Sequence, residues 1–124
     1  MDERWKVEFH DEFGPEFLRF SEVVRQQIIS LSRLLERFGP LLSRPHVDTL
    51  KGSRRRNLKE LRFHADDGAW RVAFAFDVKR RAILLVGGDK SGVSPERFYR
   101  SLIEVAERRF DQHQNALAAK GEKR

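Results

Sequence analysis

The stretch that decides the fold is residues 58–76, LKELRFHADDGAWRVAFAF. Apolar residues alternate with polar or small residues on both sides of its centre, and this period of two predicts strands with one buried face. Asp67-Gly68 lies between the two runs. Asp-Gly in that position is typical of a hairpin, because both central residues of a type I′ turn need a positive φ. The sequence therefore predicts an antiparallel hairpin with Asp67 and Gly68 at its turn.

This turn predicts which residues face each other across the hairpin. Phe63 would face Val72. Leu61 would face Phe74, two positions further from the turn. All four apolar residues then share one face, so the predicted register buries that face consistently.

The other face of the hairpin is polar, and we expect it to contact solvent, as one face of an antiparallel sheet often does. It carries Glu60, Arg62, His64 and Arg71 beside small alanines. Arg62 and Arg71 would be diagonal neighbours, and two guanidinium groups so close repel each other unless an anion lies between them. The face is thus either a binding site for phosphate or an ordinary solvated surface.

The remaining elements follow from periodicity and from helix-capping residues. Alternation over residues 5–9 predicts a short N-terminal strand. The helical period over residues 12–38 predicts a short and a long helix packed as a hairpin, with Ser21 near the break and Gly39-Pro40 at the end. Residues 41–57 have no clear period and predict a loop with at most one helical turn.

After the hairpin, the uniformly apolar residues 82–87 predict a strand that is buried on both faces. Ser94 and Pro95 begin a helix that we expect to end near Gln112. The order of strand, two helices, three strands and helix is an α+β architecture. We expect a single domain over residues 1–114 and a disordered basic tail over residues 115–124.

Composition narrows the function. The 25 Lys and Arg exceed the 19 Asp and Glu, and the net charge of +6 favours an anionic partner: nucleic acid, an acidic protein or a membrane surface. The absence of Cys excludes disulfides, cysteine nucleophiles and thiolate metal sites. The N-terminus shows no signal peptide, and the longest apolar run, residues 82–86, is too short to span a bilayer. We expect a cytoplasmic protein with no membrane partner.

A basic loop leads into the polar face of the hairpin. Its cationic side chains are Lys51, Arg54, Arg55, Arg56 and Lys59. Cations that neutralise phosphates release condensed counterions, which gives affinity without sequence reading. These residues are candidates for RNA binding, and the alternative is a solvated basic loop.

Two further residues extend the candidate site. Lys90 ends the last strand, close to where the neighbouring strands place Arg62 and Arg71. His64 shares their face, and because an imidazole can both accept and donate a proton, it is a candidate for proton transfer. The four histidines have no metal-ligand spacing, and we expect neither a metal site nor a cofactor.

Four segments together resemble a known family: RPHVDTLKG at 44–52, LKELR at 58–62, WRV at 70–72 and GDK at 88–90. They are similar to RelE/HigB-like toxins of type II toxin–antitoxin systems, in the phage-derived branch of the RelE/ParE superfamily. The resemblance covers most of the chain and implies a RelE-like fold. It also implies ribosome-dependent, metal-independent cleavage of mRNA, by attack of the ribose 2′-OH on the adjacent phosphate, and inhibition by a cognate antitoxin, often a helix-turn-helix protein.

By motif, the resemblance implies that Arg62 and Arg71 stabilise charge on the phosphate and that Lys90 is a third basic group, with Lys59 assisting. Several such toxins use a Tyr or His near the C-terminus for proton transfer. The one Tyr of this chain, Tyr99, follows a helix cap, so the proton-transfer pair stays unassigned. His64 is a candidate from its position in the hairpin and not from the family.

Two other functions stay open at this point. A ParE-like inhibitor of DNA gyrase has the same fold and is not a nuclease. A nucleic-acid-binding regulator would not be an enzyme. The cluster of Arg62, Arg71 and Lys90 favours the nuclease, because a gyrase inhibitor would not need it. The lack of a recognisable helix-turn-helix counts against the regulator.

Overall fold

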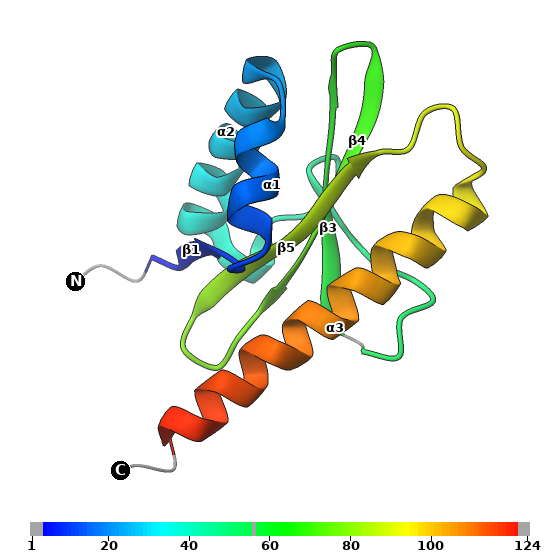
Figure 1. Ribbon diagram of the computed structural model, residues 1–124. Coiled ribbons are helices and arrows are strands. Elements are labelled where there is room, and N and C mark those ends of the chain that lie inside the picture. The colour runs from blue at the N-terminus through cyan, green and yellow to red at the C-terminus, as the bar shows by residue number, and fades with distance from the viewer. Residues whose placement is uncertain (1–3, 56, 122–124) are drawn as a thin grey trace.

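The structure is a computed structural model that describes residues 4–55 and 57–121. Within those residues, five strands form one sheet in the order β1-β5-β4-β3-β2. Strand β1 is parallel to β5, and the other neighbours are antiparallel. Helices α1 and α2 cover one face and α3 crosses the other, which confirms the predicted α+β class (Figure 1). The elements are β1 (Lys6–Phe9), α1 (Phe13–Arg19), α2 (Glu22–Phe38), a 3-10 helix (Gly39–Leu41), β2 (Val47–Thr49), β3 (Leu58–Ala65), β4 (Gly68–Phe76), β5 (Arg81–Asp89) and α3 (Pro95–Gly121).

Helix α2 begins and ends where its capping residues, Ser21 and Gly39, predict. The Ser21 side chain caps α2 by accepting a hydrogen bond from the backbone N–H of Val24. Gly39 ends α2 with a φ of 53°, a conformation that favours glycine. A Cβ at Gly39 would also lie 2.4 Å from the Trp5 ring, so the close approach of β1 to this helix end excludes a larger residue.

The turn of the β3–β4 hairpin lies one residue earlier than predicted. Asp66 and Asp67 are the turn residues, with φ of 51° and 60°, and Ala65 faces Gly68. Aspartate tolerates this left-handed conformation because its short side chain bonds locally. Gly68 is instead needed inside β4, where a Cβ would lie 2.4 Å from the Asp89 carboxylate.

The earlier turn shifts the predicted pairing by two residues. Phe63 faces Trp70, with their rings stacked at 6.2 Å, and Leu61 faces Val72. The predicted partners of Phe63 and Leu61 were therefore wrong. Because the side-chain period of a strand is two, the shift leaves every residue on its predicted face.

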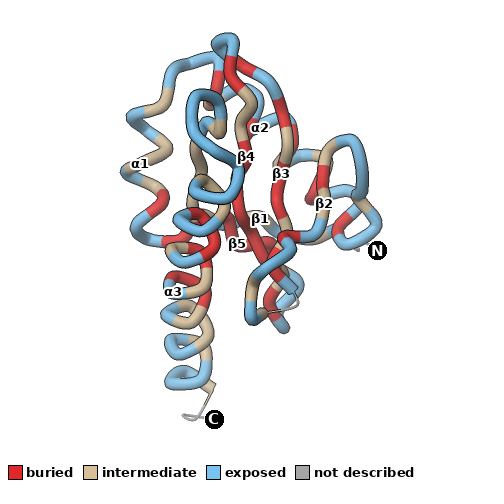
Figure 2. The backbone as a smooth tube through the Cα atoms, turned by 90° about the vertical axis from the view of Figure 1, so that its right-hand side faces the viewer, coloured by how far each residue is buried: buried red, intermediate tan, exposed pale blue. Residues whose placement is uncertain are grey.

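The polar face of the hairpin, predicted to contact solvent, is largely covered because α3 packs on it, and of its polar residues His64 stays exposed. Ala73 and Ala75 are fully buried beneath this helix. Their small side chains admit the larger residues of α3: Leu102, Ile103, Ala106 and Phe110. Figure 2 shows the resulting burial along the central strands. Arg71 is consequently only 5% exposed, so a change at this position is not a surface substitution.

Strand β5 is buried on both faces, as its apolar run predicts. Ala82 and Leu84 contact the core beneath α1 and α2, whereas Ile83 and Leu85 contact the core beneath α3. Leu85 is the extra residue of a bulge, because Ala73 of β4 pairs with Val86 while its neighbour pairs with Leu84.

Two segments differ from their predictions. Residues 41–57, predicted to be a loop, include the short strand β2 at the edge of the sheet. Helix α3 continues to Gly121, beyond the predicted end near Gln112 and through much of the tail predicted to be disordered. His113 holds this extension against the sheet, because its Nε2 lies 2.8 Å from the Asp77 carboxylate. No helix in the described part of the chain is both long and apolar enough to cross a bilayer.

Asp77 closes the β4–β5 turn, and its side chain is fully buried. Its carboxylate accepts hydrogen bonds from the backbone N–H groups of Lys79 and Arg81, from the Arg81 guanidinium and from His113. Burial alone would raise the pKa of Asp77, but these hydrogen bonds outweigh it and lower that pKa below its ordinary value. The stabilisation is fully present above the unfolded-state pKa of about 3.9 and is lost as the pH falls through the lower folded-state pKa.

We expect Asp77→Asn to lower the free energy of unfolding by about 2 kcal/mol at pH 7, because a buried charged acceptor is lost. The variant should also lose less stability than the wild type between pH 5 and pH 2. Urea unfolding across that pH range measures both effects. Asp67→Asn, at an exposed turn position that suits Asn, is the matched control. An Asp77→Asn variant with the wild-type pH dependence would contradict this account.

Candidate functional site

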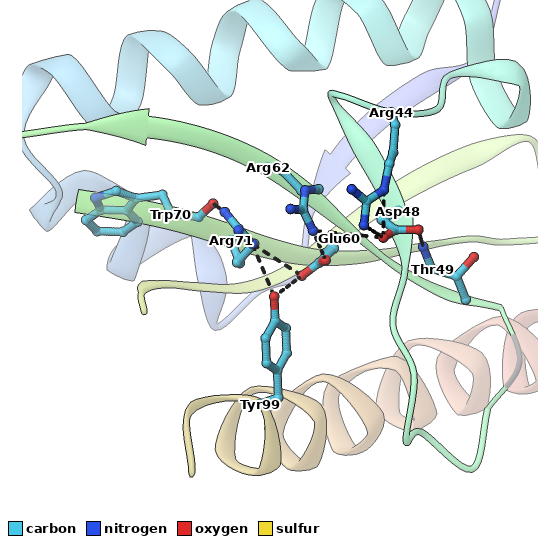
Figure 3. A network of polar contacts seen from close by, with 8 residues as sticks. All are labelled: Arg44, Asp48, Thr49, Glu60, Arg62, Trp70, Arg71 and Tyr99. Atoms are coloured by element: carbon cyan, nitrogen blue, oxygen red, sulfur yellow. Dashed lines mark hydrogen bonds and ion pairs between the residues drawn. The ribbon is translucent and has the colours of Figure 1, made fainter. Parts of the chain in front are cut away.

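The two arginines predicted to form the site face each other directly, Arg62 on β3 and Arg71 on β4. Glu60 lies between them (Figure 3). Arg62 Nη1 donates to Glu60 Oε2 at 2.9 Å, and Arg71 Nε lies 3.7 Å from Glu60 Oε1. Glu60 is only 3% exposed, so an internal carboxylate relieves the repulsion between the two guanidinium groups.

Tyr99, near the start of α3, completes this cluster. Its hydroxyl accepts a hydrogen bond from Arg71 Nε at 3.1 Å and donates one to Glu60 Oε1 at 2.9 Å. Burial raises the pKa of Tyr99, so the hydroxyl stays protonated at neutral pH. Arg71 Nη1 also donates to the Trp70 carbonyl at 2.9 Å. These bonds hold the Arg71 side chain in one orientation.

A second carboxylate extends the network to the edge strand β2. Arg44 donates to Asp48 Oδ2 through Nε at 3.2 Å and through Nη2 at 2.6 Å. The hydrogen bond from Arg44 lowers the pKa of Asp48. Arg62 Nη1 lies 3.9 Å from the same carboxylate oxygen. Three arginines thus gather around two carboxylates.

A cavity of about 490 Å³ opens beside these arginines, at the outer edge of β3. It forms because β2 has three residues and β3 has eight, so β2 covers only the first half of that edge. The last backbone bond there joins the Arg62 N–H to the His46 carbonyl at 2.9 Å. Strands β3 and β4 line the cavity with Arg62, Phe63, His64 and Arg71. The loop before β2 adds Arg44 and His46.

The structure brings together three of the predicted catalytic residues, Arg62, Arg71 and His64, at this cavity. Lys90 lies two positions beyond Gly88, which faces Arg71, and its backbone N–H donates to the Ala69 carbonyl at 2.8 Å. The register therefore places Lys90 beside the site without making it part of the cavity wall. Lys59 alternates onto the opposite face of β3 from Arg62, so it does not join this group.

The basic loop before β3 is fastened to α3. Arg54 and Arg55 form ion pairs with Asp111, and Arg54 Nε also lies 3.3 Å from Glu107. Hydrogen bonds from both arginines lower the pKa of Asp111. Lys51 is exposed, and Arg56 lies outside the described residues. A role of this loop in RNA binding stays a prediction, with two of its cations already paired within the molecule.

The sequence reasoning missed five residues of the site: Arg44, His46, Asp48, Glu60 and Tyr99. Glu60 carried a usable signal, because it lies two positions before Arg62 and so shares its face. Asp48 and His46 come from a segment whose hydrophobic residues follow no helical or strand period. Tyr99 lies on α3, 28 residues after Arg71 in the chain. Local patterns do not show that these segments meet.

The arrangement suits an anionic ligand that needs charge stabilisation and proton transfer. The Arg62 side chain is 24% exposed, so its guanidinium is accessible from the cavity while Glu60 holds it. His46 and His64 add imidazole side chains to the cavity wall. Across residues 4–55 and 57–121, no three His, Asp or Glu side chains gather as metal ligands would.

Comparison with curated proteins finds relatives in Mycobacterium tuberculosis. The proposed toxin HigB3 is 47% identical over 78 residues, which cover 63% of this chain and 66% of that protein. The proposed toxin HigB2 is 39% identical over 87 residues, which cover 69% of this chain and 43% of that protein. The chain therefore spans less than two thirds of the length of either relative.

Solved structures share the fold at low sequence identity. A mutant of the Escherichia coli toxin RelE in its free state aligns with a TM-score of 0.58 and 12% identity, over 81% of this chain and 94% of that chain. The RelE–RelB complex of Pyrococcus horikoshii OT3 aligns with a TM-score of 0.52 and 17% identity, over 73% of this chain and 99% of that chain. These likenesses confirm the predicted RelE-like fold.

The family model described as phage-derived protein Gp49-like matches residues 15–111, which is most of the chain. That range contains most of α1, the whole of α2 and of the β3–β4 hairpin, and the part of α3 that includes Tyr99. The resemblance to the phage-derived branch of RelE/HigB-like proteins is thereby confirmed. On this match, the chain belongs to the family of phage-derived Gp49-like proteins.

Proposed function

We propose that this protein is the toxin of a type II toxin–antitoxin system, and that it inhibits translation by cleaving mRNA on the ribosome. The observation that carries the proposal is the pair of facing arginines, Arg62 and Arg71, held by Glu60 and Tyr99 at the wall of a cavity. The names of HigB3 and HigB2 support a toxin. The RelE–RelB complex supports an antitoxin as partner.

The cavity contains the groups that the reaction requires. The ribose 2′-oxygen forms a bond to phosphorus while the bond to the 5′-oxygen breaks, which leaves a 2′,3′-cyclic phosphate and a 5′-hydroxyl. One group must accept the 2′-OH proton and another must protonate the 5′-oxygen. His46 and His64 are the imidazoles that line the cavity and are proposed to transfer these protons. Arg62 and Arg71 donate hydrogen bonds to the phosphate oxygens, where negative charge grows.

The proposed partners follow from the same site. The net charge of +6 favours approach to ribosomal RNA and to the bound message. A cognate antitoxin, proposed to be a helix-turn-helix protein, would keep the toxin from the ribosome. These partners place the proposed activity in the cytoplasm, and no cofactor takes part in the proposed reaction.

Induced expression in a bacterial host without antitoxin tests the function. Growth and incorporation of labelled amino acids should stop within minutes of induction, whereas Arg62→Ala expressed at the same level should stop neither. Co-expression of an adjacent reading frame that encodes the antitoxin should restore growth. Continued protein synthesis in the presence of folded wild-type protein would contradict the proposal.

We expect Tyr99→Phe to lower the maximal rate of cleavage on ribosomes by roughly tenfold, because Arg71 loses the hydroxyl that orients it. The ribosome concentration at half-maximal rate should not change, since the cavity surface is unchanged. The pH profile should keep its shape, because a protonated hydroxyl that only positions Arg71 does not transfer protons. Loss of one limb of that profile would instead identify Tyr99 as a proton-transfer group.

A further inference from the structure

The cavity beside the arginines has two chemically different sides. Helix α2 lines one side with a stripe of residues at helical spacing: Gln27, Ser30, Leu31 and Leu34. Leu31 and Phe63 are buried and form an apolar wall, whereas Gln27 and Ser30 are exposed at its rim. Arg62 and Arg71 line the opposite side.

The open edge of β3 adds backbone hydrogen-bonding groups to the same cavity. The Arg62 N–H points outward from the sheet, where it meets the His46 carbonyl. Because backbone groups alternate along a strand, the N–H and carbonyl of His64 point the same way. Strand β2 does not reach His64, since its pairing with β3 ends at Leu61. A donor and an acceptor are thus available on the cavity edge.

A nucleotide has the same division of chemistry. Its base is flat, with apolar faces and hydrogen-bonding edges, and its phosphate is anionic. RNA-binding proteins recognise unstacked bases through such edges. A glutamine amide presents a donor and an acceptor together, which matches the paired groups of a base edge. A volume of about 490 Å³ lies within the range of small-molecule sites.

We propose that this cavity binds a single nucleotide of RNA, with its phosphate on Arg62 and Arg71 and its base against α2, and that Gln27 reads the base edge. The inference rests on the proposed function, because it takes the bound RNA as the substrate. It adds a determinant of sequence preference on a helix that contributes nothing to the chemical step. Ser30 and the backbone of His64 are the other polar groups within reach of the base edge.

Sequencing of cleavage ends tests the role of Gln27. Purified ribosomes carrying a message library with randomised codons are treated with wild type, Gln27→Ala or Gln26→Ala. Gln26 is the matched control, because it is an exposed neighbour on α2 that does not line the cavity. We expect Gln27→Ala to change the base preference at one position beside the cut by roughly five- to tenfold. Gln26→Ala should cut as the wild type does.

Binding measured without ribosomes separates this inference from the proposed function. Amide chemical shifts of the wild-type protein are followed by NMR during titration with each ribonucleoside 3′-monophosphate, and with inorganic phosphate. Each nucleotide should shift the amides of Gln27, Ser30 and His64, whereas phosphate alone should shift only residues near Arg62 and Arg71. Nucleotide-dependent shifts on α2 from a protein that cuts no message would support the pocket and contradict the nuclease. Cleavage with unchanged base preference in Gln27→Ala, or α2 amides that no nucleotide shifts, would overturn the inference.

Discussion

Arg62→Ala is expected to reduce mRNA cleavage on ribosomes by roughly a hundredfold or more, while the protein stays folded. A guanidinium that meets the phosphate as charge grows acts mainly on the transition state, and removal of one such donor costs on the order of 3 kcal/mol. Stability should fall less than when Arg71 is removed, because the Arg62 side chain is 24% exposed, so water can take its place, and because Glu60 keeps its contacts with Arg71 and Tyr99.

Single-turnover cleavage, beside a thermal melt of each variant, measures this effect. Arg33→Ala is the matched control, because Arg33 is an exposed arginine of α2 outside the cavity and its loss lowers the net charge equally. Arg33→Ala should cleave at the wild-type rate. Full cleavage by a folded Arg62→Ala protein would remove Arg62 from the site.

Arg71→Ala is expected to lose both activity and stability, unlike Arg62→Ala. The sequence places Arg71 on a solvated face, where its removal would leave folding intact, but the structure buries it beneath α3 beside Glu60. Removal of one partner from a buried ion pair leaves the other charge without full compensation, which costs about 3 kcal/mol. Arg62 and Tyr99 still contact Glu60 and limit the loss.

A double variant checks that cause. Glu60→Gln in the Arg71→Ala background removes the buried charge while keeping the size of the side chain. The double variant should recover part of the free energy of unfolding that Arg71→Ala loses. Urea denaturation of the wild type, the two single variants and the double variant measures this recovery. An Arg71→Ala protein as stable as the wild type, or a double variant less stable than the sum of the single changes, would contradict the buried network.

The strands and their faces were predictable from the sequence, because alternation depends on neighbouring residues. The turn of the hairpin was not. Asp67-Gly68 is the stronger local signal, but Gly68 is needed where the Asp89 carboxylate packs over β4, 21 residues later in the chain. A contact so distant in sequence leaves no trace in a local pattern, and both turns place the side chains on the same faces.

The burial of the polar face was also beyond local reasoning. The apolar stripe of α3 predicts a helix with one buried side, but it does not say which face of the sheet it covers. Ala73 and Ala75 mark the covered face once the structure is known, since small residues on a strand allow a helix to pack closely. The same packing brings Tyr99 to Arg71 and so determines how the predicted arginines are held.

Only part of the site was predictable, again because local patterns link only residues that are close in sequence. Arg62, His64 and Arg71 follow from alternation within one hairpin, and the structure places all three at one cavity. The cavity depends on the length of β2, a strand that lies in a segment without a period. His46, in the loop just before that strand, therefore had no signal that linked it to the hairpin.

The most direct test of the central claim is primer-extension mapping of a defined message on purified ribosomes. Wild-type protein should produce cuts within the translated region, with 2′,3′-cyclic phosphate ends, and only when ribosomes occupy the message. Arg62→Ala at the same concentration should produce none above background. An intact message after treatment with folded wild-type protein, above all if the same protein inhibits DNA supercoiling by gyrase, would contradict the assignment of this cavity as a ribonuclease site.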